Sequence, residues 1–230
     1  MQRLFAIGSF LVFAACASSP QVPAPVFYPK VDYGLPGDPN NPEQGPFQPN
    51  AELFVCQGGV SNAPPFDRSG RVTNFNPIVI VENTVVIAPV PANEVCISSG
   101  YGARGGRLHK GSDYAPRPRG EDRIIYTAAP GRIREVGFAR GLGNQVLIDH
   151  GYGIYTRYAH LETIEPWVQA GVEIGFGHPL GYMGDSGNTT GVHLHFEVLT
   201  GDINNPQASF GLQSSDPLAF PAWPGVDNPL

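Results

Sequence analysis

Short β-type runs, separated by glycine-containing turns, make up the second half of the chain. Runs such as GRIREVGFA (131–139) and NQVLIDH (144–150) have the length and composition of strands and are separated by glycine-containing turns. Glycine suits the tight turns and bulges between such strands because it adopts positive φ without strain. The chain contains 29 glycines and 24 prolines, and no stretch has the period of an amphipathic helix. The pattern predicts an all-β protein made of antiparallel strands.

Further runs extend this pattern in both directions. We expect strands in GIYTRYAHL (153–161), PLGYMG (179–184) and VHLHFEVL (192–199). Earlier in the chain, ELFVC (52–56) has strand composition, and PIVIVENTVVIA (77–88) has the composition of two paired strands that turn at Glu82-Asn83.

The first residues have the pattern of an export signal. An apolar run from Leu4 to Phe13 follows Arg3, and the small residues Ala14 and Ala15 precede Cys16. This order is typical of a bacterial lipoprotein, with residues 1–15 as the signal peptide and a lipidated Cys16 as the first mature residue. Ordinary secretion with cleavage nearby is the alternative, and in both cases the protein leaves the cytoplasm.

The region after Cys16 has the composition of a spacer. Residues 16–50 are rich in Pro, Asn and Gly and contain too few aliphatic residues to form a core. We therefore expect a flexible Pro-rich tether over 16–50, an N-terminal β extension over 51–95 and a single domain over 96–222.

The overall charge argues against nucleic acid as a partner. The net charge is −6, with 14 Lys and Arg against 20 Asp and Glu, so the basic excess that phosphate contacts require is missing.

Cys56 and Cys96 are an even pair once Cys16 is set aside. In an oxidising compartment a disulfide between them is the expected outcome, and two buried free thiols are the alternative. A metal site made of cysteines alone is disfavoured because neither residue belongs to a CxxC pair.

The stretch GVHLHFEV (191–198) places polar side chains on one face of a predicted strand. His193, His195 and Glu197 alternate with apolar residues that face the other way. A half-exposed strand whose histidines have no function is the alternative for this stretch alone.

Two other segments contain histidines. In LHKGSDYA (108–115) Gly111 argues against a helix, so a loop is expected to bring His109 and Asp113 together where a strand begins. In TRYAHL, Tyr158 and His160 are expected on one strand face. Two histidines and an aspartate can bind zinc and leave the fourth position for water. From the residues alone, the choice between His193 and His195 as the ligand stays open.

Taken together, these segments resemble a known family. HKGSD (109–113), YAHL (158–161) and GNTTGVHLHFEV (187–198) are similar to the three signature segments of the lysostaphin-type, or LytM-domain, zinc metallopeptidases, which are peptidoglycan endopeptidases. The similarity extends over about 97–200, and DPLAF (216–220) resembles the closing segment of the family. The resemblance implies an all-β, antiparallel, sandwich-like LytM-type peptidase domain over 96–222.

The resemblance also implies roles for individual residues. His109, Asp113 and His195 would bind Zn²⁺, and His160 and His193 would be the catalytic residues beside it. Glu197 would be a neighbour of the site and not a ligand, and His150 and His178 would be structural or exposed. Residues expected to line the substrate groove are Tyr101, Arg104, Asn188 and Thr189.

The function implied is that of a zinc-dependent endopeptidase that hydrolyses the peptide cross-links of peptidoglycan. Its partners would be peptidoglycan peptide stems and, through the lipid anchor, a membrane, so we expect an exported, periplasm-facing lipoprotein of the outer membrane. The cleaved bond stays open between D-alanyl-diaminopimelyl and glycyl-glycine.

Two alternatives belong to other classes of protein. A non-catalytic LytM-type module that activates other wall hydrolases typically loses zinc ligands, whereas all are present here. An adhesion domain with a structural metal would close its site with four protein ligands, whereas three are matched here.

Overall fold

The computed structural model describes residues 52–73, 78–80, 83–85, 88–91, 94–118, 123–205, 207 and 211–219. Every regular element in this part of the chain is a strand, and every strand pair is antiparallel. The predicted all-β class is confirmed. Among the described residues, no helix has the length and apolar character needed to cross a membrane. The predicted signal peptide, Cys16 and the tether over 16–50 lie outside the described residues.

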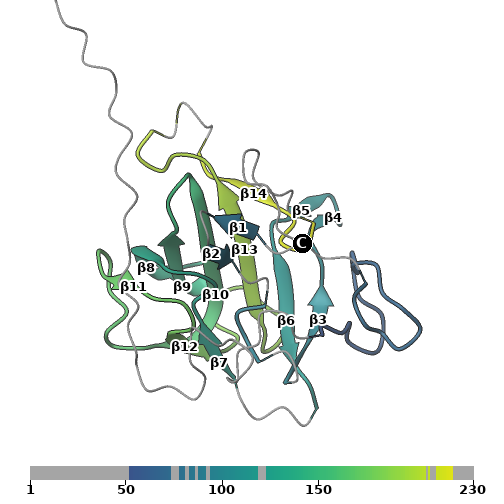
Figure 1. Ribbon diagram of the computed structural model, residues 1–230. Helices are drawn as coiled ribbons and strands as arrows, with labels where there is room; N and C mark the ends of the chain where they lie inside the picture. The colour runs from purple at the N-terminus through teal and green to yellow at the C-terminus, as the bar shows by residue number, and fades with distance from the viewer. Residues whose placement is uncertain are drawn as a thin grey trace, which may run out of the picture.

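The strands of the described residues are shown in Figure 1. In chain order they are β1 (Ile78–Ile80), β2 (Asn83–Val85), β3 (Val95–Ser99), β4 (Gly102–Arg104), β5 (Arg107–His109), β6 (Ser112–Pro116), β7 (Ile124–Tyr126), β8 (Gly131–Ala139), β9 (Gly143–Asp149), β10 (Ile154–Ile164), β11 (Glu173–Ile174), β12 (Pro179–Met183), β13 (Leu194–Thr200) and β14 (Gln213–Ser215).

One large sheet has the strand order β11-β8-β9-β10-β13-β6-β3, with β14 added beside β13. The eleven-residue strand β10 holds the sheet together. Its first half pairs with β9 and β13, and its second half pairs with β12, which in turn pairs with β7. In Figure 1, β12 and β7 therefore lie at one end of the sheet, and β13 lies between β10 and β6.

Two short hairpins lie outside the large sheet. The β1-β2 hairpin pairs Ile80 with Asn83, as the turn at Glu82-Asn83 predicts. The β4-β5 hairpin turns on Gly105 and Gly106, whose φ values of 54° and 78° are the positive values that a two-residue hairpin turn needs. This tight turn places His109 beside Asp113 on β6 and His195 on β13 of the large sheet.

The core follows the alternation that the sequence predicts for β13. Leu194, Phe196 and Val198 are completely buried in the main hydrophobic cluster, where Phe196 packs against the ring of Tyr158. His195 and Glu197 consequently point to the opposite face of the sheet. The main cluster also includes the side chains of Leu53 and Val72 from the N-terminal extension. The described part of the extension thus packs into the same core as the strands that follow it.

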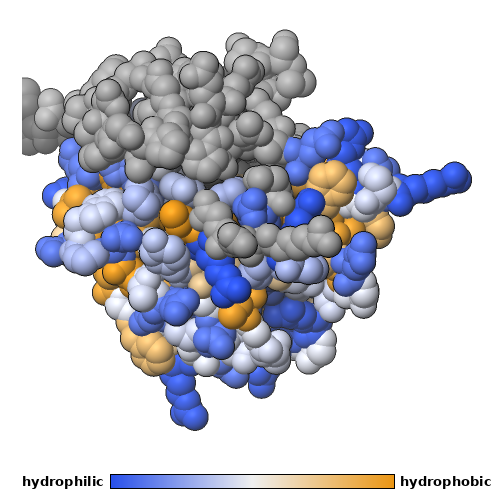
Figure 2. Space-filling model, turned by 90° about the horizontal axis from the view of Figure 1, so that it is seen from below, coloured by the Kyte–Doolittle hydropathy of each residue, from blue (hydrophilic) through white to orange (hydrophobic). Residues whose placement is uncertain are grey.

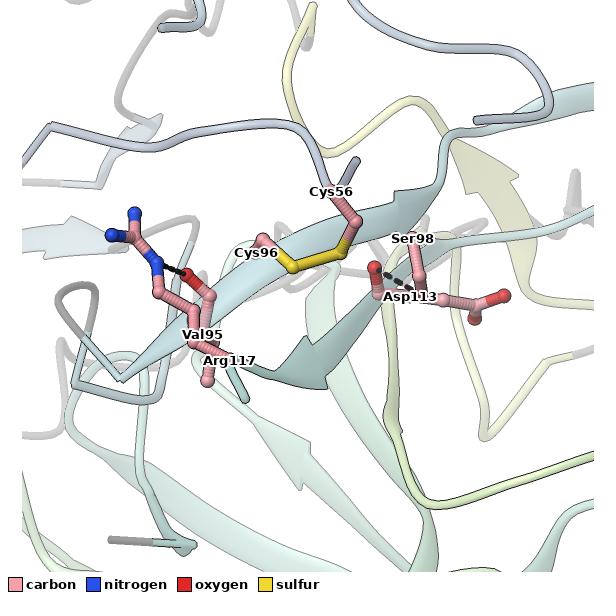
Figure 3. The surroundings of a disulfide bond; sticks show 6 residues. All are labelled: Cys56, Val95, Cys96, Ser98, Asp113 and Arg117. Atoms are coloured by element: carbon pink, nitrogen blue, oxygen red, sulfur yellow. Dashed lines mark hydrogen bonds between the residues drawn. A yellow bond between two sulfur atoms is a disulfide. The ribbon is translucent and has the colours of Figure 1, made fainter. Parts of the chain in front are cut away.

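A disulfide joins the extension to the sheet, as predicted. Cys56 is bonded to Cys96 on β3, and the backbone N–H groups of Cys56 and Ile97 donate to the carbonyls of Ile97 and Phe54. Instead of the expected strand over 52–56, this segment makes isolated bridges at Phe54 and Val55. Figure 3 shows the disulfide beside Ser98, whose hydroxyl donates to the backbone carbonyl of Asp113 on β6.

The surface of the described residues is largely polar. Figure 2 shows hydrophobic residues as small groups scattered among hydrophilic ones on the face seen from below. Isolated exposed apolar side chains are normal on a folded protein and do not mark a docking site.

Candidate metal centre

Three of the predicted site residues converge at one edge of β13. Asp113 on β6 and His195 on β13 are directly opposite each other in the antiparallel register, with 2.8 Å between Asp113 Oδ1 and His195 Nδ1. His109, at the end of β5, places its Nε2 3.0 Å from Asp113 Oδ1 and 3.1 Å from His195 Nδ1. All three side chains are buried.

Gly111 permits this approach. The chain bends between β5 and β6, and a Cβ on Gly111 would overlap the carbonyl oxygen of Phe196 on the neighbouring strand. The absence of a side chain therefore lets the segment from His109 to Asp113 lie against β13. This is the loop at a strand entry that the sequence predicts for the two residues.

Acceptors on the far side of each ring let the nitrogens that face Asp113 bind a metal. His109 Nδ1 lies 2.6 Å from the carbonyl oxygen of Gly100, and His195 Nε2 lies 3.2 Å from Glu197 Oε1. Carbonyl and carboxylate oxygens only accept, so each of these nitrogens has a partner for an N–H. When each ring carries its proton on this far side, His109 Nε2 and His195 Nδ1 are unprotonated and available as metal ligands.

These three atoms lie within about 3 Å of one another, and a positive charge among them, either a proton on His195 or a metal ion, stabilises the arrangement. Bonds of 2.0–2.1 Å at tetrahedral angles place the ligand atoms of zinc about 3.3 Å apart, close to the observed separations. The donor set of two imidazoles and one carboxylate also suits zinc. The residues present therefore fit a zinc ion, and three protein ligands leave one position open.

The electrostatics of the cluster also favour a cation. Burial by itself would raise the pKa of Asp113, but hydrogen bonds from His109 and His195 hold it well below its usual range. Burial likewise opposes protonation of His195, but Asp113 and Glu197 outweigh it and raise the pKa of His195 to about 9. Positive charge is thus stabilised at the point where the ligand atoms meet.

His160 reaches the site through an unusual backbone conformation. Its φ is +62°, and the register of β10 shifts between Tyr158 and Leu161. Tyr158 pairs with Phe196 and faces the core, so the prediction that Tyr158 and His160 share a strand face is wrong. The left-handed conformation turns the His160 side chain to the site face, where its ring centroid lies 5.9 Å from that of His195. Such strain in a residue other than glycine is concentrated at functional sites.

His160 and His193 lie side by side, with ring centroids 4.7 Å apart. His160 Nδ1 is 2.8 Å from the carbonyl oxygen of Ser186, and His193 Nδ1 is 2.8 Å from that of Gly191. Both Nδ1 atoms therefore donate, which leaves each Nε2 able to accept a proton. Burial lowers the pKa of His160. His193 Nε2 lies 3.8 Å from Asp113 Oδ1, next to the candidate ligand set.

The four predicted groove residues have different surroundings. Arg104 donates to Ser99 Oγ at 2.8 Å and lies 3.8 Å from Asp113 Oδ2, and Thr189 Oγ1 is 3.1 Å from His193 Nδ1. The Tyr101 hydroxyl instead donates to the carbonyl of Ser214 on β14. The backbone N–H of Asn188 donates to the carbonyl of Gly141, in the turn between β8 and β9. Their role in substrate binding stays a prediction.

The remaining two histidines are buried away from the cluster. His150 lies between the carbonyl of Pro130 and the hydroxyl of Thr156, 2.7 Å from each. His178 packs edge-on against Trp167, with ring centroids 5.6 Å apart. Of the two expectations, structural or exposed, the structure supports the first.

Sequence reasoning missed the groups that orient the histidines. These groups are the backbone carbonyls of Gly100, Ser186 and Gly191. Every residue has a backbone carbonyl, so the residue type does not predict which of them will contact a histidine. The contact of Glu197 with His195 had a signal, because residues two apart on a strand share a face. That contact was not assigned a function.

The site lies within a segment that matches a known family. Residues 107–207 match peptidase family M23.

Three relatives illustrate the similarity. The DD-carboxypeptidase/endopeptidase Mpg of Neisseria meningitidis is 40% identical over 101 residues, which are 44% of this chain and 22% of the relative. The peptidoglycan DD-endopeptidase ShyA of Vibrio cholerae is 34% identical over 111 residues, 47% of this chain and 25% of the relative. The outer membrane antigenic lipoprotein B of Haemophilus influenzae is 35% identical over 138 residues, 56% of this chain and 32% of the relative. The chain thus spans a third or less of the length of each.

Proposed function

We propose that the protein is a zinc-dependent endopeptidase that hydrolyses the peptide cross-links of peptidoglycan. The observation that carries the proposal is the convergence of three potential ligand atoms beside two further histidines. His109 Nε2, Asp113 Oδ1 and His195 Nδ1 would hold the zinc. His160 and His193, whose rings lie side by side, would be the catalytic residues, and the contact of each Nδ1 with a backbone carbonyl leaves Nε2 to take up a proton.

When bound, zinc would supply a Lewis acid that polarises a peptide carbonyl and makes hydroxide available near neutral pH. The residues of the protein would transfer the protons of the reaction. Because their Nδ1 atoms donate to backbone carbonyls, His160 and His193 can accept the proton of the attacking water at Nε2. The ring that has gained this proton can then deliver it to the leaving amine. The lowered pKa of His160 keeps this ring neutral, as a general base requires.

For the substrate we propose the D-alanyl-diaminopimelyl cross-link. Support comes from two relatives, one named a DD-carboxypeptidase/endopeptidase and the other a peptidoglycan DD-endopeptidase. Arg104 places a half-exposed positive charge next to Asp113, and such a charge favours a substrate that carries carboxylates near the cleaved bond. A glycyl-glycine bridge has no side-chain carboxylate.

We also propose that the protein is a lipoprotein anchored through Cys16 on the periplasmic side of the outer membrane. The apolar run that ends in small residues before Cys16 supports this placement. A relative named an outer membrane antigenic lipoprotein agrees with it. The Pro-rich segment over 16–50 would let the domain reach the wall, since polyproline-like chain extends about 3 Å per residue.

Digestion of purified muropeptides tests the enzymatic proposal. The mature protein, loaded with zinc, would be incubated with a D-alanyl-diaminopimelyl cross-linked dimer, and the products would be measured by mass. We expect conversion to two monomers whose masses add up to that of the dimer plus one water, and loss of this activity with a chelator. Zinc bound at one per chain without cleavage of any peptidoglycan peptide would instead favour a module that activates other hydrolases.

A further inference from the structure

A buried ion pair lies behind His195, on the side away from the candidate metal. Glu197 uses its two carboxylate oxygens for two different partners. Oε1 is 3.2 Å from His195 Nε2, and Oε2 is 2.9 Å from Nη1 of Arg157. Glu197 and Arg157 are directly opposite each other on β13 and β10. The contacts therefore form a continuous chain from Arg157 through Glu197 to His195.

The burial of this chain limits how the carboxylate can move. The Glu197 side chain is 2% exposed and that of Arg157 is 20% exposed. With Oε2 engaged by the guanidinium, Oε1 is held against the ring of His195. A buried carboxylate in this position cannot turn to water without losing a charged partner.

The contact with Glu197 also determines which ring nitrogen of His195 can bind a metal. A neutral imidazole carries one N–H, and His195 has a carboxylate at each ring nitrogen, Asp113 at Nδ1 and Glu197 at Nε2. When a metal binds on the Asp113 side, the proton must lie on Nε2, and the Glu197 carboxylate is the acceptor that holds it there. Nδ1 is then left unprotonated, and this is the atom that faces Asp113 and His109. With the proton on Nδ1 instead, the ring would point an N–H at the place where the ligand atoms converge.

We propose that the Arg157–Glu197 ion pair is a positioning device that fixes the ring orientation and tautomer of His195 for metal binding. This inference rests on the proposed zinc site and goes beyond it, because it assigns a role to two residues that do not touch the metal. Glu197 itself is not a ligand in this arrangement, since it contacts the nitrogen on the opposite side of the ring from Asp113.

The first test measures zinc affinity on the metal-free folded protein by competition with a chromophoric chelator. Removing an outer partner of a metal-binding histidine typically weakens metal binding 10- to 100-fold. We expect a loss in this range for Glu197→Gln, which keeps the shape but removes the anionic acceptor. The matched control is Glu162→Gln, an exposed glutamate on β10, which should bind zinc within about twofold of wild type.

A double variant separates positioning from simple charge imbalance. Glu197→Gln leaves the charge of Arg157 unpaired near the metal, and that charge alone would repel zinc. Arg157→Met with Glu197→Leu removes both charges and also the acceptor at His195 Nε2, and replacing a buried ion pair by neutral residues is often tolerated by the fold. If Glu197 acts as a hydrogen-bond acceptor, the double variant should still bind zinc at least about tenfold more weakly than wild type.

A spectroscopic readout is independent of affinity and of activity. In zinc-loaded wild type, the Nε2–H of His195 should give an imidazole proton resonance that is protected from solvent exchange. The double variant, which has no acceptor at this nitrogen, should lose this protection.

The results of these measurements distinguish the positioning role of Glu197 from the zinc site and from the proposed function. Wild-type zinc affinity in the double variant, or in Glu197→Gln, would overturn the positioning role. If wild type binds no zinc at all, the ligand set fails, and the proposed function and this inference fail with it. If wild type binds zinc but cleaves no peptide, only the proposed function fails, and the variants still decide the role of Arg157 and Glu197.

Discussion

Asp113 and His195 face each other across the neighbouring strands β6 and β13, with Oδ1 and Nδ1 2.8 Å apart. Their meeting is set by the register of the sheet, since a slip of one residue would turn either side chain to the opposite face. On the other side of β13, its register with β10 places Glu197, two residues further along, opposite Arg157. The candidate centre is therefore built on paired strands, which hold a geometry more firmly than loops do.

Substitution of the two neighbouring histidines should separate metal binding from chemistry. His195→Ala leaves two protein ligands, so bound zinc should fall sharply and activity should vanish with it. His193→Ala should keep most of the zinc but lose about a hundredfold or more in turnover, the usual scale for a positioned acid or base. Zinc content by elemental analysis and cleavage of a cross-linked muropeptide are measured for each variant.

The other site residues provide matched comparisons for this experiment. His160→Ala should behave like His193→Ala, and both His109→Ala and Asp113→Ala should behave like His195→Ala. If His193→Ala removes zinc as completely as His195→Ala does, both histidines are ligands and the assignment is wrong.

Gly111→Ala should disrupt the entry to β6. The new methyl group would overlap the carbonyl oxygen of Phe196, so either the loop or β13 must shift. We expect a loss of about 1–3 kcal/mol in the free energy of unfolding, together with weaker zinc binding. Gly137→Ala on β8 is the control, because a Cβ there meets open space and should change stability by no more than about 0.5 kcal/mol. Equal stability of the two variants in denaturant unfolding would contradict the proposed role of Gly111.

The disulfide should contribute substantially to stability. Cys56 and Cys96 are 40 residues apart, and closing a loop of this length stabilises by roughly 3 to 4 kcal/mol in the chain-entropy model. The double variant Cys56→Ser with Cys96→Ser should therefore show a correspondingly lower free energy of unfolding. An oxidised wild-type protein that unfolds at the same denaturant concentration as this variant would show that the bond contributes nothing.

His150 should make stability depend on pH. Burial lowers its pKa from the ordinary 6.5 to about 4. The folded protein then binds fewer protons than the unfolded chain, so the free energy of unfolding should fall as the pH drops from about 6.5 to 4. The loss from this one group should be about 3 kcal/mol.

Other groups titrate over the same range, so the measurement is a comparison with His150→Gln. The difference in unfolding free energy between wild type and variant should narrow as the pH falls. A difference that stays constant from pH 7 to pH 4 would show that the pKa of His150 is not lowered.

Much of the fold follows from local pattern in the sequence. The alternation in GVHLHFEV puts Leu194, Phe196 and Val198 in the core and sends His195 and Glu197 to the other face, as observed. These predictions succeed because side-chain direction in a strand depends only on position along it.

The predictions that failed concern backbone features that a local sequence pattern does not contain. Strict alternation puts Tyr158 and His160 on one face, but the positive φ of His160 and the register shift of β10 break it. The sequence does not predict this break in the alternation, because the residue in the left-handed conformation is a histidine and not a glycine. The short strands β7 and β11 were not predicted either, since two or three residues are too few to have a period.

The most direct test of the metal centre is anomalous X-ray diffraction at the zinc edge from crystals of the zinc-loaded protein. We predict one peak per chain, about 2 Å from each of His109 Nε2, Asp113 Oδ1 and His195 Nδ1, with Glu197 outside bonding distance. A peak bonded to Glu197 or at another place in the molecule, or no peak in crystals of zinc-loaded protein, would contradict the account.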